Sequence, residues 1–340
     1  MSQKIIVTGG AGYIGSHTCV ALIESGFDVV VFDNLSNSGT ASLDGVLRIT
    51  GTRPEFINVD CTDVTALRSA FTAHSDAVGV IHFAALKAVG ESVEKPLLYY
   101  RNNLGGLINV LDLMRELNIP NIVFSSSATV YGVPDVLPVT EDTPLQPATS
   151  PYGQTKVMGE NIIRDTVRAY PQISATLLRY FNPIGAHPSA EIGELPNGVP
   201  NNLMPYITQT AAGIRECLSI FGNDYDTPDG FCVRDYIDIN DLARAHVSAL
   251  RHMLSGATGV GVFNLGTGRG ASVMELVDAF RAATGVDVPY KIVARRAGDV
   301  PAIWANADMA ARILGWRAIV PLKETLASAW RWQKRVSGIK

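Results

Sequence analysis

The stretch KIIVTGGAGYIG, residues 4–15, decides how this chain folds. Residues 4–8 are apolar and rich in β-branched side chains, which predicts a short buried strand. Glycines follow at once, and the apolar periodicity of residues 13–25 predicts a helix. A strand, a glycine loop and a helix in this order are typical of a dinucleotide site, in which the pyrophosphate lies on the helix N-terminus. Two framings of the loop are open, Gly10-x-Gly12-x-x-Gly15 and Gly9-x-x-Gly12-x-x-Gly15.

The second predicted strand, residues 28–32, ends at an acid, Asp33. A carboxylate at this place accepts hydrogen bonds from the adenosine ribose hydroxyls and repels a 2′-phosphate. The next candidates for contact are Asn34, Asn37 and Ser38, and no arginine stands among them to bind such a phosphate. The pattern therefore favours NAD over NADP.

Strands and helices alternate through the first half of the chain. Further strands are predicted at residues 55–58, 77–83, 121–126 and 175–180, and helices at 65–73, 96–117 and 151–170. This alternation predicts an α/β fold with a Rossmann-type, doubly wound parallel sheet. After residue 180 the pattern gives way to loops over 181–203, with a strand at 262–265 and a helix at 272–284. We expect an NAD-binding domain over 1–180 and a smaller, mixed α/β substrate domain over 181–340, from which the chain returns to the first domain in places.

Side chains suited to a cofactor follow the third and fourth strands, at the edge where open α/β sheets bind ligands. Asp60 and Cys61 are expected to reach the adenine. Ala84 and Ala85 are small enough for a cofactor to lie across the strand end, and Lys87 can pair with a phosphate.

The stretch SPYGQTK, residues 150–156, begins a predicted helix, with Ser150 as its cap and Pro151 as its first residue. Tyr152 and Lys156 then lie one turn apart on one face. A nearby ammonium favours the phenolate and lowers the pKa of a tyrosine, which makes it a better base. The alternative to a catalytic pair is a Tyr–Lys pair on the surface without a function. The glycine loop and Asp33 favour the catalytic interpretation.

Composition excludes several classes of function. Hydrophobic residues make up 47% of the chain and charged residues 18%, and the net charge of −4 is spread without long runs of one sign. This argues against a general binder of nucleic acid or of membrane surfaces. The four cysteines have no CxxC spacing, and the six histidines show no ligand pattern, so neither a disulfide framework nor a metal is expected. We expect no membrane span and a cytoplasmic location.

Several longer strings carry a resemblance. GGAGYIG, FSSSATVYG, SPYGQTK and RYFNPIGAH, together with Asp33, resemble the extended short-chain dehydrogenase/reductase family. HFAALKAVGES, NNLMPY, FGNDY, VRDYI and GDVPA resemble those members of the family that epimerise UDP-sugars at carbon 4. The likeness runs from about residue 4 to about residue 332.

This resemblance implies a reversible reaction between UDP-galactose and UDP-glucose, as in galactose metabolism, with a bound NAD. Tyr152 would take the proton of the sugar 4-hydroxyl while a hydride leaves carbon 4 for the nicotinamide. The resulting 4-keto sugar would turn about its link to the diphosphate and take the hydride back on its other face. Lys156 would hold the nicotinamide ribose and lower the pKa of Tyr152, Ser127 would hydrogen-bond the sugar hydroxyl, and Thr129 would contact the sugar.

The same resemblance assigns binding residues by position and implies a homodimer, formed by the helices at 96–117 and 151–170. The UDP-binding set falls on Asn182, Asn201, Asn202, Leu203, Phe221, Arg234, Tyr236, Arg296 and Asp299. Further cofactor or substrate contacts fall on Tyr13, Ile14, Phe83, Lys87, Asn102 and Tyr180.

One position departs from the family pattern. Familiar bacterial members have a tyrosine where Ile303 stands in GDVPAI. Since isoleucine is smaller and has no hydroxyl, we hypothesise that the pocket admits an N-acetyl group on carbon 2, so that UDP-N-acetylglucosamine and UDP-N-acetylgalactosamine are a second substrate pair.

Two alternatives are weighed. A nucleotide-sugar 4,6-dehydratase or a decarboxylase of this family needs carboxylates just after the fifth strand, where Ala128 and Thr129 stand here. A non-catalytic NAD-sensing regulator typically lacks the tyrosine and the lysine, and this chain has both Tyr152 and Lys156.

Overall fold

The core of the molecule is a parallel sheet of seven strands in the order β11-β6-β5-β4-β1-β2-β3. A computed structural model describes residues 2–296 and 298–339. The strands are β1 (Lys4–Thr8), β2 (Asp28–Asp33), β3 (Glu55–Asn58), β4 (Gly79–His82), β5 (Asn121–Ser127), β6 (Ser174–Tyr180) and β11 (Val260–Leu265). The order reverses direction between β1 and β4, which makes the sheet doubly wound. The predicted fold class is confirmed.

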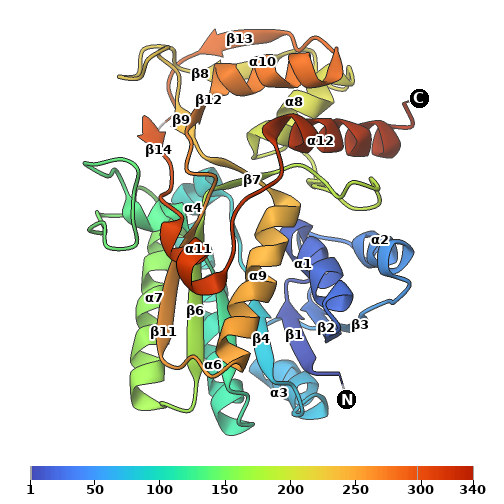
Figure 1. The fold of residues 1–340 in the computed structure, drawn as a ribbon, viewed down its shortest axis with the longest axis vertical. Helices are drawn as coiled ribbons and strands as arrows, with labels where there is room; N and C mark the ends of the chain where they lie inside the picture. The colour runs from blue at the N-terminus through green and yellow to red at the C-terminus, as the bar shows by residue number, and fades with distance from the viewer. Residues whose placement is uncertain (1, 297, 340) are drawn as a thin grey trace.

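Helices cover both faces of this sheet (Figure 1). One face carries α1 (Tyr13–Glu24), α2 (Ala41–Thr50), α9 (Ile239–Leu254) and α11 (Asp308–Leu314). The other carries α3 (Val64–Ala73), α6 (Gly105–Glu116) and α7 (Pro151–Ala169). Alternate residues of β1 supply the two cores, because Ile5 and Val7 pack into the first and Ile6 into the second.

The single helix expected over 96–117 is interrupted. It consists of α5 (Pro96–Tyr99), a π-helical segment η1 (Tyr100–Leu104) and α6, preceded by α4 (Val89–Glu94). The wider turn of η1 contains Asn103, whose Oδ1 accepts a hydrogen bond from Leu86 N at 2.8 Å and whose Nδ2 donates to Leu86 O at 3.0 Å. The apolar periodicity of a sequence does not reveal a short π-helical segment within a helix.

A smaller lobe of short strands and helices lies above the sheet in Figure 1. Its strand pairs are β7 (Asn182–Ile184) with β10 (Tyr236–Asp238), β8 (Leu218–Phe221) with β13 (Tyr290–Val293), and β9 (Val233–Arg234) with β12 (Ala271–Ser272) and β14 (Ala302–Ile303). Its helices are α8 (Leu203–Ala211), α10 (Val273–Thr284) and α12 (Leu322–Ser337). The expectation of loops throughout 181–203 was therefore wrong at both ends, since residues 182–184 form a strand and Leu203 begins a helix. A three-residue strand is set by its distant partner rather than by a local pattern.

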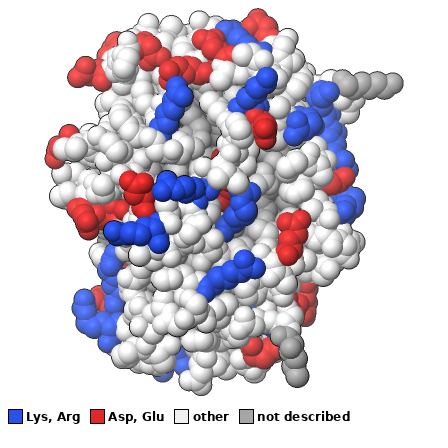
Figure 2. Space-filling view, viewed as in Figure 1, with Lys and Arg blue, Asp and Glu red and all other residues white. Residues whose placement is uncertain are grey.

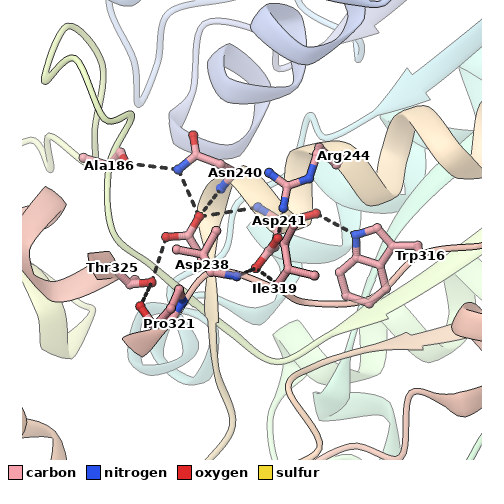
Figure 3. A network of polar contacts seen from close by, with 10 residues as sticks. Ala186, Asp238, Asn240, Asp241, Arg244, Trp316, Ile319, Pro321 and Thr325 are labelled. Atoms are coloured by element: carbon pink, nitrogen blue, oxygen red, sulfur yellow. Dashed lines mark hydrogen bonds and ion pairs between the residues drawn. The ribbon is translucent and has the colours of Figure 1, made fainter. Parts of the chain in front are cut away.

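The chain crosses between the two lobes more than once. After the small strands β7 to β10 it returns to the sheet as α9 and β11, and α11 follows later. Two buried carboxylates at the start of α9 hold this crossing (Figure 3). Asp238 accepts hydrogen bonds from Asn240 N and from Thr325 Oγ1, both at 2.8 Å, and Asp241 accepts from Ile319 N and Val320 N. The division into 1–180 and 181–340 stays a prediction.

The surface carries charges of both signs. Lysine and arginine side chains are interspersed with acidic ones on the face shown in Figure 2. Within the described residues, no helix is both long and apolar enough to cross a membrane. Over the same ranges, no group of three or more His, Cys, Asp or Glu side chains is placed to hold a metal ion.

Candidate active site

The glycine loop joins β1 to α1 and is closely packed against the neighbouring strands. Gly9 has a φ of +71°, and a Cβ on it would lie 2.8 Å from Ala84 N at the end of β4. A Cβ on Gly15 would lie 2.7 Å from Gly10 Cα. Larger residues at Gly9 or Gly15 would push the loop away from the strand ends, so this geometry requires glycine.

The N-terminus of α1 fits a dinucleotide diphosphate. Gly12 is the N-cap, and no side chain caps the helix there, so its first N–H groups have no side-chain acceptor. A Cβ on Gly12 would meet one atom within 4 Å, Gly9 O at 3.3 Å, which leaves the approach to the helix end open. Free N–H groups and the positive end of the helix dipole are what a diphosphate needs. Tyr13 and Ile14 form the first turn of this helix.

Asp33 closes the loop from the side of β2. Its carboxylate is buried and accepts hydrogen bonds from Ala11 N at 3.0 Å, Leu35 N at 2.8 Å and Ser38 Oγ at 2.9 Å. A carboxylate oxygen has room for more than one donor, so ribose hydroxyls can still bind there. Asn37, on the same loop, is exposed.

The ends of β2 and β3 meet beside Asp33. Asn34 Nδ2 donates to Asp60 Oδ2 at 2.7 Å, and Cys61 is buried next to it. Asp60 and Cys61 therefore lie beside Asp33 and Asn34 at the ends of β2 and β3, and their contact with the adenine stays a prediction. The hydrogen bonds from Thr62 and Asn34 outweigh partial burial and lower the pKa of the Asp60 carboxyl.

Lys87, expected to bind a phosphate, contacts an acid in this structure. Its Nζ lies 3.5 Å from Glu194 Oε1, which also accepts a hydrogen bond from Asn202 Nδ2 at 2.5 Å. One carboxylate thus joins a predicted cofactor residue to a predicted substrate residue. Ala84 and Ala85, between β4 and Lys87, are half-buried.

The predicted catalytic helix begins as expected. Ser150 is the N-cap of α7, its Oγ accepts from Gly153 N at 3.1 Å, and Pro151 is the first helical residue. The Lys156 side chain is buried, and its Nζ donates to Ser125 O at 2.6 Å. The same Nζ lies 5.0 Å from the centre of the Phe124 ring and 5.7 Å from that of the Tyr152 ring.

Burial shifts the pKa values of both members of this pair. Burial raises the pKa of Tyr152 to about 12, against a hydrogen bond with Ser127 that lowers it. Burial lowers the pKa of Lys156 to about 8, against the charge of Glu160, which raises it. In the protein alone the pKa of Tyr152 is therefore raised, because desolvation dominates; the lowering expected from Lys156 together with a bound nicotinamide stays a prediction.

Hydroxyls gather where β5 ends. Ser127 Oγ accepts from Thr129 N at 3.2 Å, and Ser125 Oγ is hydrogen-bonded to the Tyr180 hydroxyl. Thr129 Oγ1 is buried, and no partner for it occurs among residues 2–296 and 298–339. A buried hydroxyl without a partner is costly in a folded protein, which makes Thr129 suited to a polar ligand.

The predicted UDP-binding residues fall into one group and several separate positions. Arg234 Nη2 lies 3.9 Å and Arg296 Nη2 2.7 Å from Asp299 Oδ1, and the Arg296 guanidinium lies over the Phe221 ring at 5.6 Å. Phe221 is 42% exposed, which leaves its ring available for stacking.

The other members lie apart from that group. Asn182 has an exposed side chain opposite the buried Tyr236 in the β7–β10 pair, and burial raises the pKa of the Tyr236 phenol. Asn201 is exposed, and Leu203 packs against the core of the small lobe. Ile303 is buried in an apolar cluster with Ala128, Val130, Tyr131, Val139, Phe181 and Ala305, between the lobes.

Remaining cofactor candidates have roles in packing. The Phe83 ring lies 4.8 Å from that of His246, and the Tyr13 hydroxyl donates to Gly185 O at 2.7 Å. Asn102 donates to Asn103 Oδ1 at 2.9 Å, and Asn103 is the more deeply buried of the two amides; the expected cofactor contact of Asn102 stays a prediction.

Sequence reasoning missed four buried polar groups near the site. They are Asn103, Glu160, Arg179 and Asp235. Glu160 was discoverable, because it stands one helical turn after Lys156. Asp235 accepts from Thr267 N, Gly268 N and Ala305 N, contacts between distant segments that no local pattern announces.

Comparisons with known proteins agree with this geometry. Residues 5–266 match the model of the NAD dependent epimerase/dehydratase family. The UDP-glucose 4-epimerase of Bacillus subtilis is 55% identical over 339 residues, which are 99% of each chain. The crystal structure of the Bifidobacterium longum UDP-glucose 4-epimerase with NAD+ and UDP has a TM-score of 0.96 and 45% identity, covering 99% of this chain and 100% of that one. The crystal structure of the Stenotrophomonas maltophila UDP-glucose-4-epimerase with NAD and formylated UDP-arabinopyranose has a TM-score of 0.95 and 46% identity, and it covers the same shares of the two chains.

A glycine loop open to a diphosphate, an acid at the end of β2 and a Tyr–Lys pair beside three serines thus occur in a chain whose relatives share nearly its whole length. The chain belongs to the NAD dependent epimerase/dehydratase family and, within it, to the UDP-glucose 4-epimerases, isomerases that use NAD.

Proposed function

We propose that this chain interconverts UDP-galactose and UDP-glucose at carbon 4, with Tyr152 as the base and acid. The observation that carries the proposal is the position of Tyr152, at the first turn of α7, near enough to Ser127 at the end of β5 for Ser127 to lower its pKa, and one turn before the buried Lys156. This edge of the sheet also holds the glycine loop.

Tyr152 takes the proton from the 4-hydroxyl and returns it when the carbonyl is reduced again. The glycine loop and Asp33 would hold NAD, which would supply a reversible hydride acceptor for carbon 4. Ser127, which lies near the phenol of Tyr152, hydrogen-bonds the same sugar hydroxyl and orients it toward the base. Lys156 supplies a positive charge that favours the phenolate when Tyr152 is ionised.

The sugar must turn between the two hydride transfers, which requires a firm hold on the nucleotide and a loose hold on the sugar. Arg234, Arg296 and Phe221 suit the nucleotide, because guanidinium groups bind phosphate and an exposed ring stacks on a base. Small hydroxyls at Ser127 and Thr129 suit the sugar. Asn182, Asn201 and the rest of the UDP-binding set keep their proposed roles.

The alternatives have less support at this site. Ala128 and Thr129 carry no carboxylate, so the acid and base that a dehydratase needs to expel the 6-hydroxyl are missing at the predicted places. A regulator that only binds NAD would not need Tyr152 beside Lys156.

The N-acetylated UDP-sugars are proposed as a second substrate pair. Ile303 lies among small and apolar side chains next to Ala128, which supports a pocket with more room than a tyrosine would leave. Pocket volume is worth about 1–3 kcal/mol in discrimination. Turnover of UDP-N-acetylgalactosamine that falls in Ile303→Tyr, with UDP-galactose turnover retained, is the expected result. No activity of the parent on the N-acetyl sugar would reject the idea.

A homodimer and a cytoplasmic location complete the proposal. Exposed apolar side chains on α5, α6 and α7, Leu97, Leu98, Ile108 and Met158, support an interface on that face. Four free cysteines, three of them buried, support a reducing compartment.

The experiment has two arms on one preparation. The purified protein is denatured and the supernatant examined for released NAD, and the native protein is assayed for UDP-glucose formed from UDP-galactose without added cofactor. Both released NAD and activity are expected. Released NAD without epimerisation would contradict the proposed reaction.

A further inference from the structure

The end of β5 is held by a contact from each of its last three residues. Ser125 O accepts a hydrogen bond from the Lys156 ammonium, Ser126 Oγ donates to Glu160 Oε1 at 2.6 Å, and Ser127 lies near Tyr152 and lowers the pKa of its phenol. The Ser126–Glu160 hydrogen bond involves neither the cofactor nor the sugar in the proposed mechanism. Its position between the two proposed catalytic contacts raises the question of what it does.

Glu160 belongs to a fully buried ion pair. Arg179 Nε lies 2.8 Å from Oε1 and Arg179 Nη2 lies 2.6 Å from Oε2 of its carboxylate, and both side chains are at most 3% exposed. The fork binds both oxygens, so the carboxylate orientation is fixed. Since Glu160 follows Lys156 by one turn of α7 and Arg179 lies on β6, the pair joins the catalytic helix to the sheet.

The pair continues into the segment that follows β5. Arg179 Nη1 donates to the Tyr131 hydroxyl at 3.1 Å, which donates to Asn264 Oδ1 at 2.6 Å. Tyr131 ends the short 3-10 helix η2 (Ala128–Tyr131), which contains Thr129. One ion pair therefore orients β5 on one side and the proposed sugar-binding turn on the other.

Stability alone is a poor explanation for this arrangement. Burying two charges costs free energy that their attraction only partly returns, and apolar pairs of similar volume are often as stable. What an apolar pair would not supply is a negative charge one turn from Lys156 and an acceptor for Ser126. Both effects act on the proposed catalytic groups.

We propose that Glu160, fixed by Arg179, is a positioning residue that holds the end of β5 in place and keeps Lys156 positively charged beside Tyr152. This inference rests on the proposed roles of Tyr152 and Lys156. The titratable groups that face Tyr152 and Lys156 from the surrounding elements are Glu160 on α7, His82 on β4, Tyr180 on β6 and Tyr99 on α5. Burial, and to a smaller extent the Lys156 charge, lowers the pKa of His82 to about 3, so His82 is uncharged at neutral pH. The cations that face Glu160 itself are Arg179 and, at 3.7 Å, Arg164.

The test compares three variants of the holoenzyme in kcat, KM for UDP-galactose and the pH profile of kcat. Glu160→Gln keeps the shape and removes the charge. Ser126→Ala removes one hydrogen bond and keeps the charges. The double variant Glu160→Leu with Arg179→Met removes the pair without leaving a buried charge. Glu116→Gln, which breaks the exposed pair with Arg68, is the matched control.

Glu160→Gln is expected to lower kcat about tenfold with KM nearly unchanged, and to move the alkaline fall of kcat to lower pH. The double variant also removes the Arg179 charge, so it is expected to show a smaller shift in the same direction while staying folded, which separates the effect from instability. Ser126→Ala is expected to lower kcat less and to leave the alkaline limb in place, and Glu116→Gln to change neither.

A parent kcat and an unmoved alkaline limb in the double variant would overturn the inference, and this readout decides even if Glu160→Gln does not fold. Failure of the proposed function has a different signature, since Tyr152→Phe would then remain active. A dead Tyr152→Phe with an unaffected double variant rejects the inference alone.

Discussion

The ammonium of Lys156 lies 5.7 Å from the centre of the Tyr152 ring and donates its hydrogen bond to Ser125 O at 2.6 Å. The lysine is thus held by the sheet and is near the phenol without bonding it. Burying the Lys156 charge beside an uncharged phenol lowers the stability of the folded protein.

Lys156→Met should stabilise the protein while removing activity. The pKa of Lys156 in the fold is about 8, below its ordinary 10.5, so between these values the unfolded chain binds more protons and stability rises with pH. The penalty is full below about pH 8 and disappears above about 10.5. A shift of this size corresponds to about 3 kcal/mol at most. Urea denaturation should show a gain of about 1–3 kcal/mol for the variant at neutral pH. An equal gain well above pH 10, or none at neutral pH, would contradict the assignment.

Gly15→Ala should disturb the cofactor loop. The new Cβ would lie 2.7 Å from Gly10 Cα and 3.0 Å from Gly10 C, backbone atoms that cannot move aside without shifting the loop. Overpacking of this kind costs about 1–3 kcal/mol. The variant should release NAD more readily, measured as nucleotide lost on gel filtration, and unfold at lower urea. Gly90→Ala is the control, because its Cβ would meet nothing within 4 Å. Full NAD retention in Gly15→Ala would argue against the loop geometry.

Tyr13→Phe should weaken the contact between the lobes. The hydroxyl of Tyr13 donates to Gly185 O at 2.7 Å, and the next residue is held by Asn240, a partner of Asp238 (Figure 3). Loss of one such bond, with the carbonyl left unpaired, costs about 1–3 kcal/mol. We expect that loss in urea denaturation, while Tyr290→Phe, which alters an exposed phenol, should change little. Equal stability of the two variants would show that the Tyr13 bond contributes nothing.

The sequence predicted those elements whose position depends on neighbouring residues in the chain. Ser150 and Pro151 start α7 as predicted, because capping depends on neighbouring residues, and the apolar strands of the sheet occur where the β-branched runs stand. Asp33 lies beside the glycine loop because parallel strands end at one edge. These features follow from spacing and side-chain chemistry alone.

Contacts between segments far apart in the chain could not be predicted from the sequence. Lys87 meets Glu194 and Arg179 meets Glu160 only after the sheet has assembled. The strand at Asn182–Ile184 exists because β10 lies beside it. The burial that raises the pKa of Tyr152 in the protein alone was also out of reach, since the sequence shows a neighbouring charge but gives no measure of burial.

The most direct test of the account is the epimerisation rate of Tyr152→Phe with UDP-galactose, alongside Tyr170→Phe at the far end of the same helix. Removal of the phenol hydroxyl takes away the group that moves the proton, so the rate should fall by about 10²–10⁴-fold with NAD still bound and the Tm unchanged. Tyr170→Phe should keep the parent rate. A Tyr152→Phe enzyme that epimerises at the parent rate would contradict the central claim.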